Sequence, residues 1–430
     1  MTDKIAAFLS SHNFAMPDVD AVARALLFDM EEGLCGRPAG QDMIKTYISP
    51  PEKSAANQDV IVIDAGGTNF RSCLVSFDSA GAATISCMEK TRMPGVEREL
   101  SRQEFFEQIA DNLEHLRDKA ERIGFCFSYP VVIQEDGDGI LLKFSKEVKA
   151  PQVEGCKIGQ ELTRVLEERG WRRDLRVVLL NDTVAALLAG AADVAAGKCY
   201  SSYVGFILGT GMNAAYIQKP LPQYEAHGLT KAQVINCEAG RFTKVARSDF
   251  DLAVDQKSER PSTGVMEKLC SGAYLGAAAF EVVRAAAGDG VFSPAVCASL
   301  LRLESLSQIE MDAFLHAPYL STSKLGEAMA SASCEERGHL FEILDALADR
   351  CARLAAAIIT ACVTKSGEGA NPTAPVKVLC NGTSFYKTYR VKERVFAYLE
   401  QSLTRGRGLY FELAQLENDI TLGTAIGGLI

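Results

Sequence analysis

The segment from Asp59 to Phe77, DVIVIDAGGTNFRSCLVSF, constrains the fold of this chain more than any other. It has the pattern of two apolar strands on either side of a glycine-rich turn. Paired glycines let backbone N–H groups approach an anion without a Cβ in the way. An Asp at the end of the first strand places a carboxylate, and with it a hydrated Mg²⁺, beside that anion. We therefore expect a nucleotide phosphate site here, and a purely structural glycine hairpin is the alternative. The residues assigned to this site are Asp64, Gly66, Gly67, Thr68, Asn69 and Arg71.

The same strand–turn–strand design recurs further along the chain. Residues 203–217, YVGFILGTGMNAAYI, carry a Gly-Thr-Gly-x-Asn turn, and residues 378–385, VLCNGTSF, carry a third glycine turn. Two related units in separate halves of the chain predict an internal duplication around a central cleft. The length of 430 residues also favours two or more domains, because single cores rarely grow beyond ~250–300 residues.

Local patterns predict several elements around these turns. Apolar residues at helical spacing predict helices over residues 17–34 and 102–122. Runs of branched apolar residues predict strands over 124–132 and 176–180. The last nine residues, LGTAIGGLI, are apolar and glycine-rich, so we expect them to pack against the first domain.

Further short motifs follow the glycine turns in a fixed order, and together they carry a family resemblance. Each motif alone is weak evidence for a family, but their order and spacing along one chain are strong evidence together. The chain resembles the hexokinase family, within the actin-like ATPase superfamily of sugar kinases, over most of its length. The motifs are FDMEEGL at 28–34, MIKTY at 43–47, the turn at 64–71, SYP at 128–130, SK at 145–146, NDT at 181–183, GTGMN at 209–213, Glu238, EKL at 267–269 with Gly272 and Gly276, and GTS at 382–384.

The resemblance implies a two-domain α/β fold of the actin-like ATPase (ribonuclease H-like) type with a central cleft. The small domain would comprise residues 59–181 and 416–430, and the large domain residues 1–58 and 182–415. The implied activity is transfer of phosphate from ATP, with Mg²⁺, to the 6-hydroxyl of a hexose, glucose foremost, with closure of the two domains. Two alternatives stay open: a catalytically weak sugar sensor on the same fold, and a kinase for mannose or an N-acetylhexosamine.

Asp182 is the expected general base, although its position alone favours another role. It follows the apolar strand RVVLL and precedes a helical segment at Thr183, so it would ordinarily be a helix N-cap. The resemblance assigns it as the base, because the family's base is the Asp of Asn-Asp-Thr. The two roles are compatible, since each uses a different carboxylate oxygen.

The remaining site residues are also implied by the resemblance. Lys146 would supply positive charge near the sugar, although the run KFSKEVK alone is more typical of a solvated surface. Asn and Glu side chains suit vicinal hydroxyls because they bridge adjacent OH groups. The implied sugar shell is Ser128, Ser145, Lys146, Asn181, Asp182, Asn213, Glu238 and Glu267. Thr210 and Gly211 would form the second wall of the ATP site, and Gly382, Thr383 and Ser384 the adenosine contact.

The chain departs from the family pattern at three places near the expected sugar site. It has Phe144-Ser145-Lys146 where Trp-Thr-Lys is usual, and Ala239 where a Trp follows the Glu. Tyr129 stands where Phe is usual. The residues for base catalysis and phosphate binding are retained, so these departures bear on which sugar is preferred.

Composition excludes several other classes of protein. The net charge of -10 argues against nucleic acid or an anionic membrane as a partner. Neither a Walker A motif nor a GxGxxG motif between strand and helix occurs, and the five histidines have no zinc-ligand spacing. The 13 cysteines are scattered without a CxxC pair, which predicts reduced thiols in the cytoplasm. A signal peptide and an apolar run of membrane-spanning length are both absent.

We expect a monomer or a homodimer whose partners are hexose and ATP, with Mg²⁺ held through phosphate and water rather than by protein ligands.

Overall fold

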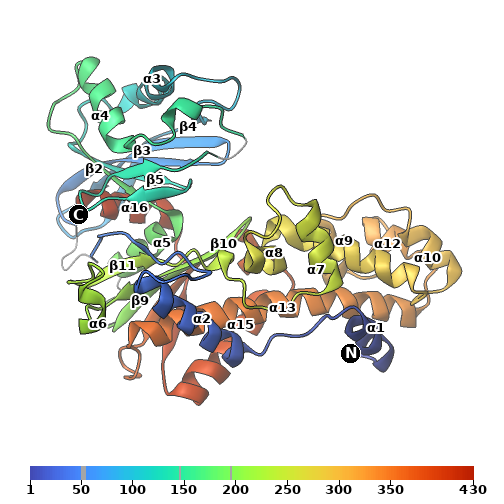
Figure 1. Ribbon diagram of the computed structural model, residues 1–430. Coiled ribbons are helices and arrows are strands. Elements are labelled where there is room, and N and C mark those ends of the chain that lie inside the picture. Colours follow the sequence, from blue (N-terminus) through green and yellow to red (C-terminus); the bar gives the residue numbers. More distant parts are fainter. Residues whose placement is uncertain (50–54, 145–146, 194–195) are drawn as a thin grey trace.

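The chain folds around two mixed β-sheets, one in each half of the molecule (Figure 1). The computed structural model describes residues 1–49, 55–144, 147–193 and 196–430. The small sheet has the order β4 (Ala83–Arg92), β3 (Asn69–Phe77), β2 (Gln58–Gly66), β5 (Arg122–Phe127) and β8 (Arg176–Leu180). The large sheet has the order β1 (Ile44–Lys45), β11 (Gln233–Asn236), β10 (Met212–Gln218), β9 (Ser202–Leu208), β12 (Val376–Asn381) and β13 (Phe411–Ala414). A short hairpin, β6 (Val131–Ile133) with β7 (Gly139–Leu141), extends the small half.

The two sheets share one strand pattern, which confirms the predicted duplication. In each sheet an antiparallel hairpin, β2–β3 or β9–β10, supplies one strand that continues into a parallel set. The parallel sets are β2–β5–β8 and β9–β12–β13. Parallel strands end at a common edge, where α/β proteins bind their ligands. The glycine turns after β2, β9 and β12, and the polar segments Ser128–Pro130 after β5 and Asn181-Asp182 after β8, therefore gather at such edges.

Two helices fill the space between the sheets (Figure 1). α16 (Asp419–Leu429) packs on β2, β5 and β8 of the small sheet, and α5 (Asp182–Ala192) packs on β9, β10 and β12 of the large one. The helices also pack on each other, which requires glycine: a Cβ at Gly423 would overlap the carbonyl of Ala185. A Cβ at Gly428 would lie 2.8 Å from the Gly124 nitrogen of β5. The predicted packing of the C-terminal segment on the first domain is thus confirmed.

The remaining helices cover the outer faces. On the small half, α3 (Arg102–Leu113) and α4 (Ile158–Glu168) pack together over the sheet. The large half carries an extended helical region around α13, the long orange helix in Figure 1. The helices of the large half are α1 (Asp3–Ser11), α2 (Val19–Leu34), α6 (Pro222–Glu225), α7 (Asp249–Lys257), α8 (Val265–Cys270), α9 (Gly272–Gly288), α10 (Pro294–Leu300), α11 (Gln308–His316), α12 (Lys324–Ala328), α13 (Cys334–Ser366), α14 (Thr383–Lys387) and α15 (Val391–Leu399).

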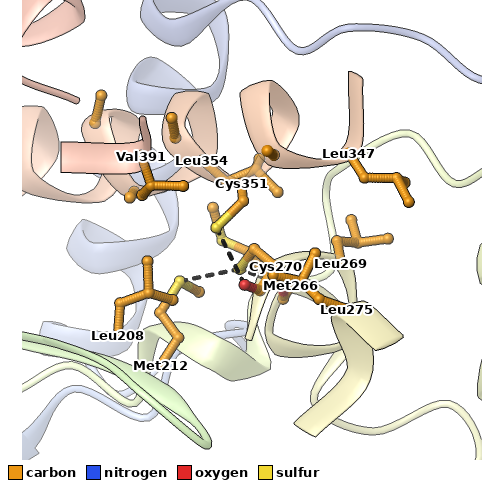
Figure 2. Packing of buried hydrophobic residues seen from close by; sticks show 14 of the residues in the cluster. Leu208, Met212, Met266, Leu269, Cys270, Leu275, Leu347, Cys351, Leu354 and Val391 are labelled. Carbon is orange, nitrogen blue, oxygen red and sulfur yellow. Dashed lines mark hydrogen bonds between the residues drawn. The ribbon is translucent and has the colours of Figure 1, made fainter. Parts of the chain in front are cut away.

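A sulfur-rich part of the core joins the two elements that carry expected sugar ligands (Figure 2). Cys270, at the end of α8, lies with its sulfur 3.2 Å from the sulfur of Met212, the first residue of β10. The Cys351 thiol of α13 donates to the carbonyl of Cys270 at 3.1 Å. All three side chains are buried, so this packing holds α8 against both β10 and α13.

Several element predictions are confirmed and two are wrong. The helix expected over 17–34 is α2, and the strand over 176–180 is β8. The helix expected over 102–122 ends at Leu113, and the 3₁₀ turn Glu114–Leu116 that follows stops at Arg117, whose ψ of 131° lies outside the helical region. The strand expected over 124–132 ends at Phe127, since the chain turns there at the edge of the sheet. The division of the chain into the two domains given above stays a prediction.

The structure also bears on two expectations drawn from composition, the state of the cysteines and the membrane-spanning segments. Every cysteine is a free thiol, and 7 of the 13 are buried. None of the helices in the described ranges is long and apolar enough to cross a membrane. Assembly state and location in the cell stay predictions.

The close crossing of α5 and α16 yields a stability prediction. Gly423→Ala should lower the free energy of unfolding by at least ~1–3 kcal/mol, because the new methyl has only backbone to displace. Gly338→Ala is the matched control, since this α13 glycine is exposed with open space around it. It should be neutral or stabilise by about 0.5–1 kcal/mol. Urea unfolding of the two variants checks this, and equal stabilities would contradict the account of the crossing.

Candidate active site

A cavity of about 700 Å³ lies between the two sheets and brings the expected sugar residues together. It is lined by segments from both halves, including the ends of β5 and β8 and the turn before β10. Ser145 and Lys146 lie outside the described residues. All other members of the implied sugar shell line the cavity: Ser128, Asn181, Asp182, Asn213, Glu238 and Glu267.

Asp182 begins α5 at the end of β8, and one of its two oxygens is committed to the helix. Its Oδ1 accepts the Thr183 backbone N–H at 2.7 Å and the Thr183 hydroxyl at 3.2 Å. The N-cap is Asn181, whose Oδ1 accepts the same N–H at 2.9 Å, so the expectation that Asp182 itself is the cap is corrected. Within the described part of the chain, no donor bonds the second oxygen, Oδ2, of Asp182. That oxygen is available to a ligand in the cavity.

The surroundings of Asp182 favour proton uptake. Burial raises the pKa of its carboxyl above the ordinary value of 3.8, and the two Thr183 hydrogen bonds oppose this effect. The negative charges of Asp64 and Asp419 add to the rise. A carboxylate with a raised pKa is a stronger base than an exposed one, which suits it to accept a proton from a hydroxyl group.

A hydrogen-bonded network of two amides and a carboxylate forms another part of the cavity wall. Asn213 Nδ2 donates to Asn236 Oδ1 at 2.7 Å and lies 3.4 Å from Glu238 Oε1. Asn236 Nδ2 donates to the same Glu238 oxygen at 2.9 Å. The backbone N–H groups of Ala214 and Ala239 fix the Asn213 oxygen at 2.7 and 3.2 Å. These bonds hold the Asn213 and Glu238 side chains in one orientation before any ligand arrives.

Asn236 lines the cavity but was missed by sequence reasoning. It is 4 % exposed and lies at the end of β11, paired with Ala215 of β10. Its spacing of two from Glu238 would put both side chains on one face of an extended segment. That spacing could have indicated Asn236 as a site residue. It is weak evidence, because a buried Asn at a strand end often has a structural role instead.

Glu267, on α8, enters the cavity beside two glycines that leave room for it. Its Oε2 accepts the Met212 backbone N–H at 3.2 Å. A Cβ at Gly211 would lie 2.7 Å from that oxygen, and one at Gly240 would lie 3.1 Å from the Glu267 Cβ. Burial raises the pKa of the Glu267 carboxyl, and the Met212 N–H opposes this.

The cavity also holds charged residues that the sequence analysis did not assign. Arg241 and Asp42 form an ion pair at the rim, and Arg260 and Lys268 line the cavity nearby. Lys268 is buried and pairs with Asp255 at 2.5 Å. Arg260 lies on the loop between α7 and α8 and Lys268 lies on α8, whereas Asp42 and Arg241 come from segments remote from them in sequence. Their meeting at the cavity therefore depends on the fold rather than on a local pattern.

The first glycine turn lies next to the cavity, at the tip of β2 and β3. Residues Gly67, Thr68 and Asn69 are exposed, and Gly67 has a positive φ of 57°. A Cβ at Gly66 would lie 3.2 Å from the Ser128 Cβ, which shows how near the turn is to the cavity wall. Asp64 bonds Arg71 at 3.2 Å, and burial raises the pKa of the Asp64 carboxyl against the effect of that arginine.

The second and third glycine turns meet at the end of the large sheet. The Ser384 hydroxyl donates to the carbonyl of Gly209 at 3.0 Å. Gly382 has φ 109°, and a Cβ there would overlap the Leu208 carbonyl and lie 2.7 Å from the Gly209 nitrogen. The N-terminus of α9 closes the same turn, with Gly272 and Ala273 donating to the carbonyls of Gly209 and Thr210 at 2.8 and 3.1 Å. The assigned residues Thr210, Gly211, Gly382, Thr383 and Ser384 thus form one connected region.

These turns fit a nucleotide and its Mg²⁺. Exposed backbone at Gly67–Asn69 offers N–H donors to phosphate, and glycine at 382 lets the third turn lie against the backbone of Leu208 and Gly209. The Asp64 carboxylate is an oxygen donor of the kind that hydrated Mg²⁺ prefers. The described residues contain no cluster of three or more His, Cys, Asp or Glu able to hold a metal directly.

Comparison with known proteins decides the family. Two hexokinase family models match, over residues 4–192 and 203–430. The chain belongs to the hexokinase family. Hexokinase-7 of Oryza sativa subsp. japonica is 30% identical over 406 residues, covering 86% of this chain and 84% of the relative. Hexokinase-1 of Schizosaccharomyces pombe is 27% identical over 392 residues, covering 85% and 78%.

Solved structures confirm the expected fold. A Schistosoma mansoni hexokinase complexed with glucose matches with a TM-score of 0.79 at 23% identity, over 100% of this chain and 98% of that one. A second hexokinase crystal structure matches with a TM-score of 0.83 at 21% identity, over 100% of both chains. The chain therefore has the two-domain α/β fold of these solved hexokinase structures.

The buried carboxylates of the cavity yield a stability prediction. Burial raises the pKa of Glu238 above 4.5, so the folded state holds its proton more tightly than the unfolded chain. Stability from this group is therefore lost as the pH rises above about 4.5 and through the folded pKa. Glu238→Gln keeps the oxygen that Asn236 bonds and removes the charge. The variant should be more stable than wild type at pH 7, and the difference should shrink toward pH 4.5.

Urea unfolding at both pH values measures this effect. Glu417→Gln, which neutralises an exposed carboxyl, is the control and should change little at either pH. A Glu238→Gln variant that is less stable than wild type at pH 7 would contradict the burial argument.

Proposed function

We propose that this protein phosphorylates the 6-hydroxyl of a hexose, glucose foremost, with ATP as the phosphoryl donor. The observation that carries the proposal is the Asp182 carboxylate, which has one uncommitted oxygen in a cavity bordered by polar side chains and glycine turns. Membership of the hexokinase family supports the same reaction class.

The sugar would bind in the cavity between the sheets. Ser128, Asn213, Glu238 and Glu267 would bond its ring hydroxyls, with the Asn213 and Glu238 orientations already set by Asn236. Preset donors and acceptors reduce the entropy that binding costs. The uncommitted oxygen of Asp182, Oδ2, would accept the proton of the 6-hydroxyl as that hydroxyl attacks the terminal phosphorus of ATP.

The glycine turns would hold the nucleotide. Backbone N–H groups at Gly67–Asn69 would bond phosphate oxygens from the small half, and the region around Gly209 and Gly382 would receive the rest of the nucleotide. Asp64 would lie beside the hydrated Mg²⁺ of the nucleotide, and the ion would supply positive charge that offsets the charge developing during transfer. Lys146, which lies outside the described residues, would add positive charge near the sugar.

Removal of the base tests the proposal. Asp182→Asn should reduce turnover of a hexose by about 10²–10⁴-fold, because the hydroxyl loses its proton acceptor. Hexose binding should persist, since the other cavity side chains remain. Phosphorylation of a panel of hexoses by Mg·ATP, together with calorimetric sugar binding, measures both effects. Asp111→Asn on the outer surface is the control and should behave as wild type.

The same assay separates the alternatives. Preference for mannose or an N-acetylhexosamine would keep the mechanism and change the substrate. Sugar binding without phosphorylation of any hexose by wild type would contradict the kinase proposal and leave a sensor on the same fold.

The raised pKa of Asp182 predicts the acid limb of the pH profile. The base must be ionised, so turnover should fall with decreasing pH through a pKa above 3.8. Asp419→Asn removes one of the charges that raise this pKa, so the acid limb of kcat should move to lower pH. An unchanged limb would argue against a contribution from Asp419, and Asp111→Asn again serves as the control.

A further inference from the structure

Tyr129 connects the sugar side of the cavity to the first glycine turn. Its ring is 6 % exposed and packs edge-on against Phe144, with ring centroids 5.1 Å apart. It also packs at a tilt against Phe127, with ring centroids 4.9 Å apart. Its hydroxyl donates to the carbonyl oxygen of Gly67 at 2.8 Å. The preceding residue is Ser128, which lines the cavity and whose backbone N–H bonds Ala65 of β2 at 3.1 Å.

The bonded carbonyl belongs to the peptide unit that also contains the Thr68 N–H. In a trans peptide the C=O and the N–H point in opposite directions. A donor that holds the Gly67 oxygen from the buried side therefore turns the Thr68 N–H toward the exposed side of the turn. Within the described residues, that N–H bonds no acceptor.

The turn has few other anchors at its tip. The Met93 N–H bonds the Thr68 carbonyl at 3.0 Å, which fixes the next peptide unit along. Residues 67–69 are otherwise exposed, and the left-handed φ of Gly67 belongs to a residue with wide conformational freedom. Without the Tyr129 bond, the Gly67–Thr68 peptide could rotate and present its oxygen instead of its N–H to the open side.

We propose that Tyr129 is a positioning residue for nucleotide binding: its hydroxyl fixes the Gly67–Thr68 peptide so that the Thr68 N–H faces the phosphates of ATP. This inference rests on the proposed function, which assigns the turn to phosphate. Burial raises the pKa of the Tyr129 hydroxyl above 10.0, so it stays protonated and able to donate at neutral pH. The same side chain would connect the sugar-binding segment mechanically to the phosphate turn.

Removal of the single oxygen atom tests the proposal. Tyr129→Phe keeps the ring and its packing against Phe144 and Phe127. If the hydroxyl positions the peptide, the dissociation constant of a non-hydrolysable Mg·ATP analogue should rise about threefold to tenfold, the range of one lost hydrogen bond. Glucose binding should change less than twofold. In turnover, the KM for ATP should rise while the KM for the hexose stays the same.

A matched control separates positioning from general loss of a tyrosine hydroxyl. Tyr216 is also buried, and its hydroxyl donates to Gln218 at 2.8 Å on the large sheet, on the strand face opposite Asn213. Tyr216→Phe should leave analogue binding unchanged, and thermal unfolding of both variants checks that each is folded. Unchanged analogue binding by folded Tyr129→Phe, or no analogue binding by wild type, would overturn the proposal.

Calorimetry keeps this test separate from the proposed function. Wild type that binds the analogue but phosphorylates no hexose would refute the kinase proposal, while the effect of Tyr129→Phe on analogue binding would still decide the role of Tyr129.

Discussion

The contact between α5 and α16 is the constraint on which the site depends. The two helices join the duplicated sheets, and glycine at 423 lets their backbones approach to van der Waals distance. Each helix begins at a carboxylate, Asp182 or Asp419, and Asp419 accepts two contacts from Asn381, the residue before the third glycine turn. The helix pair therefore sets both the spacing of the sheets and the position of the proposed base relative to the nucleotide region.

The cavity concentrates negative charge at a cost to stability. Burial raises the pKa of the Asp182, Glu238 and Glu267 carboxyls, so each opposes folding when it is ionised at neutral pH. Backbone and amide donors offset part of this cost, and they also orient the carboxylates. This arrangement is typical of sites in which function rather than stability determines the residue type.

The sequence predicts the glycine turns and the residues beside them because the turns need particular residue types at fixed spacing. Asp182 is assigned as the base by the family resemblance, because its position alone favours a helix cap. The identity of the cap could not be predicted: two polar residues in a row, Asn181 and Asp182, compete for that role, and backbone geometry decides. Asn236 and the bond from Tyr129 to Gly67 depend on contacts between strands remote in sequence. Helical periodicity also continues in the sequence past Leu113, where the α-helix gives way to a 3₁₀ turn that stops at Arg117.

In the proposed complex, a hexose lies in the cavity with its 6-hydroxyl at the uncommitted oxygen of Asp182. A crystal structure of the protein with the hexose that binds most tightly in calorimetry tests this most directly. We expect the sugar between Asn213, Glu238 and Glu267, with O6 about 2.6–3.2 Å from Asp182 Oδ2. A sugar bound outside this cavity, or one that turns another hydroxyl toward Asp182, would contradict it.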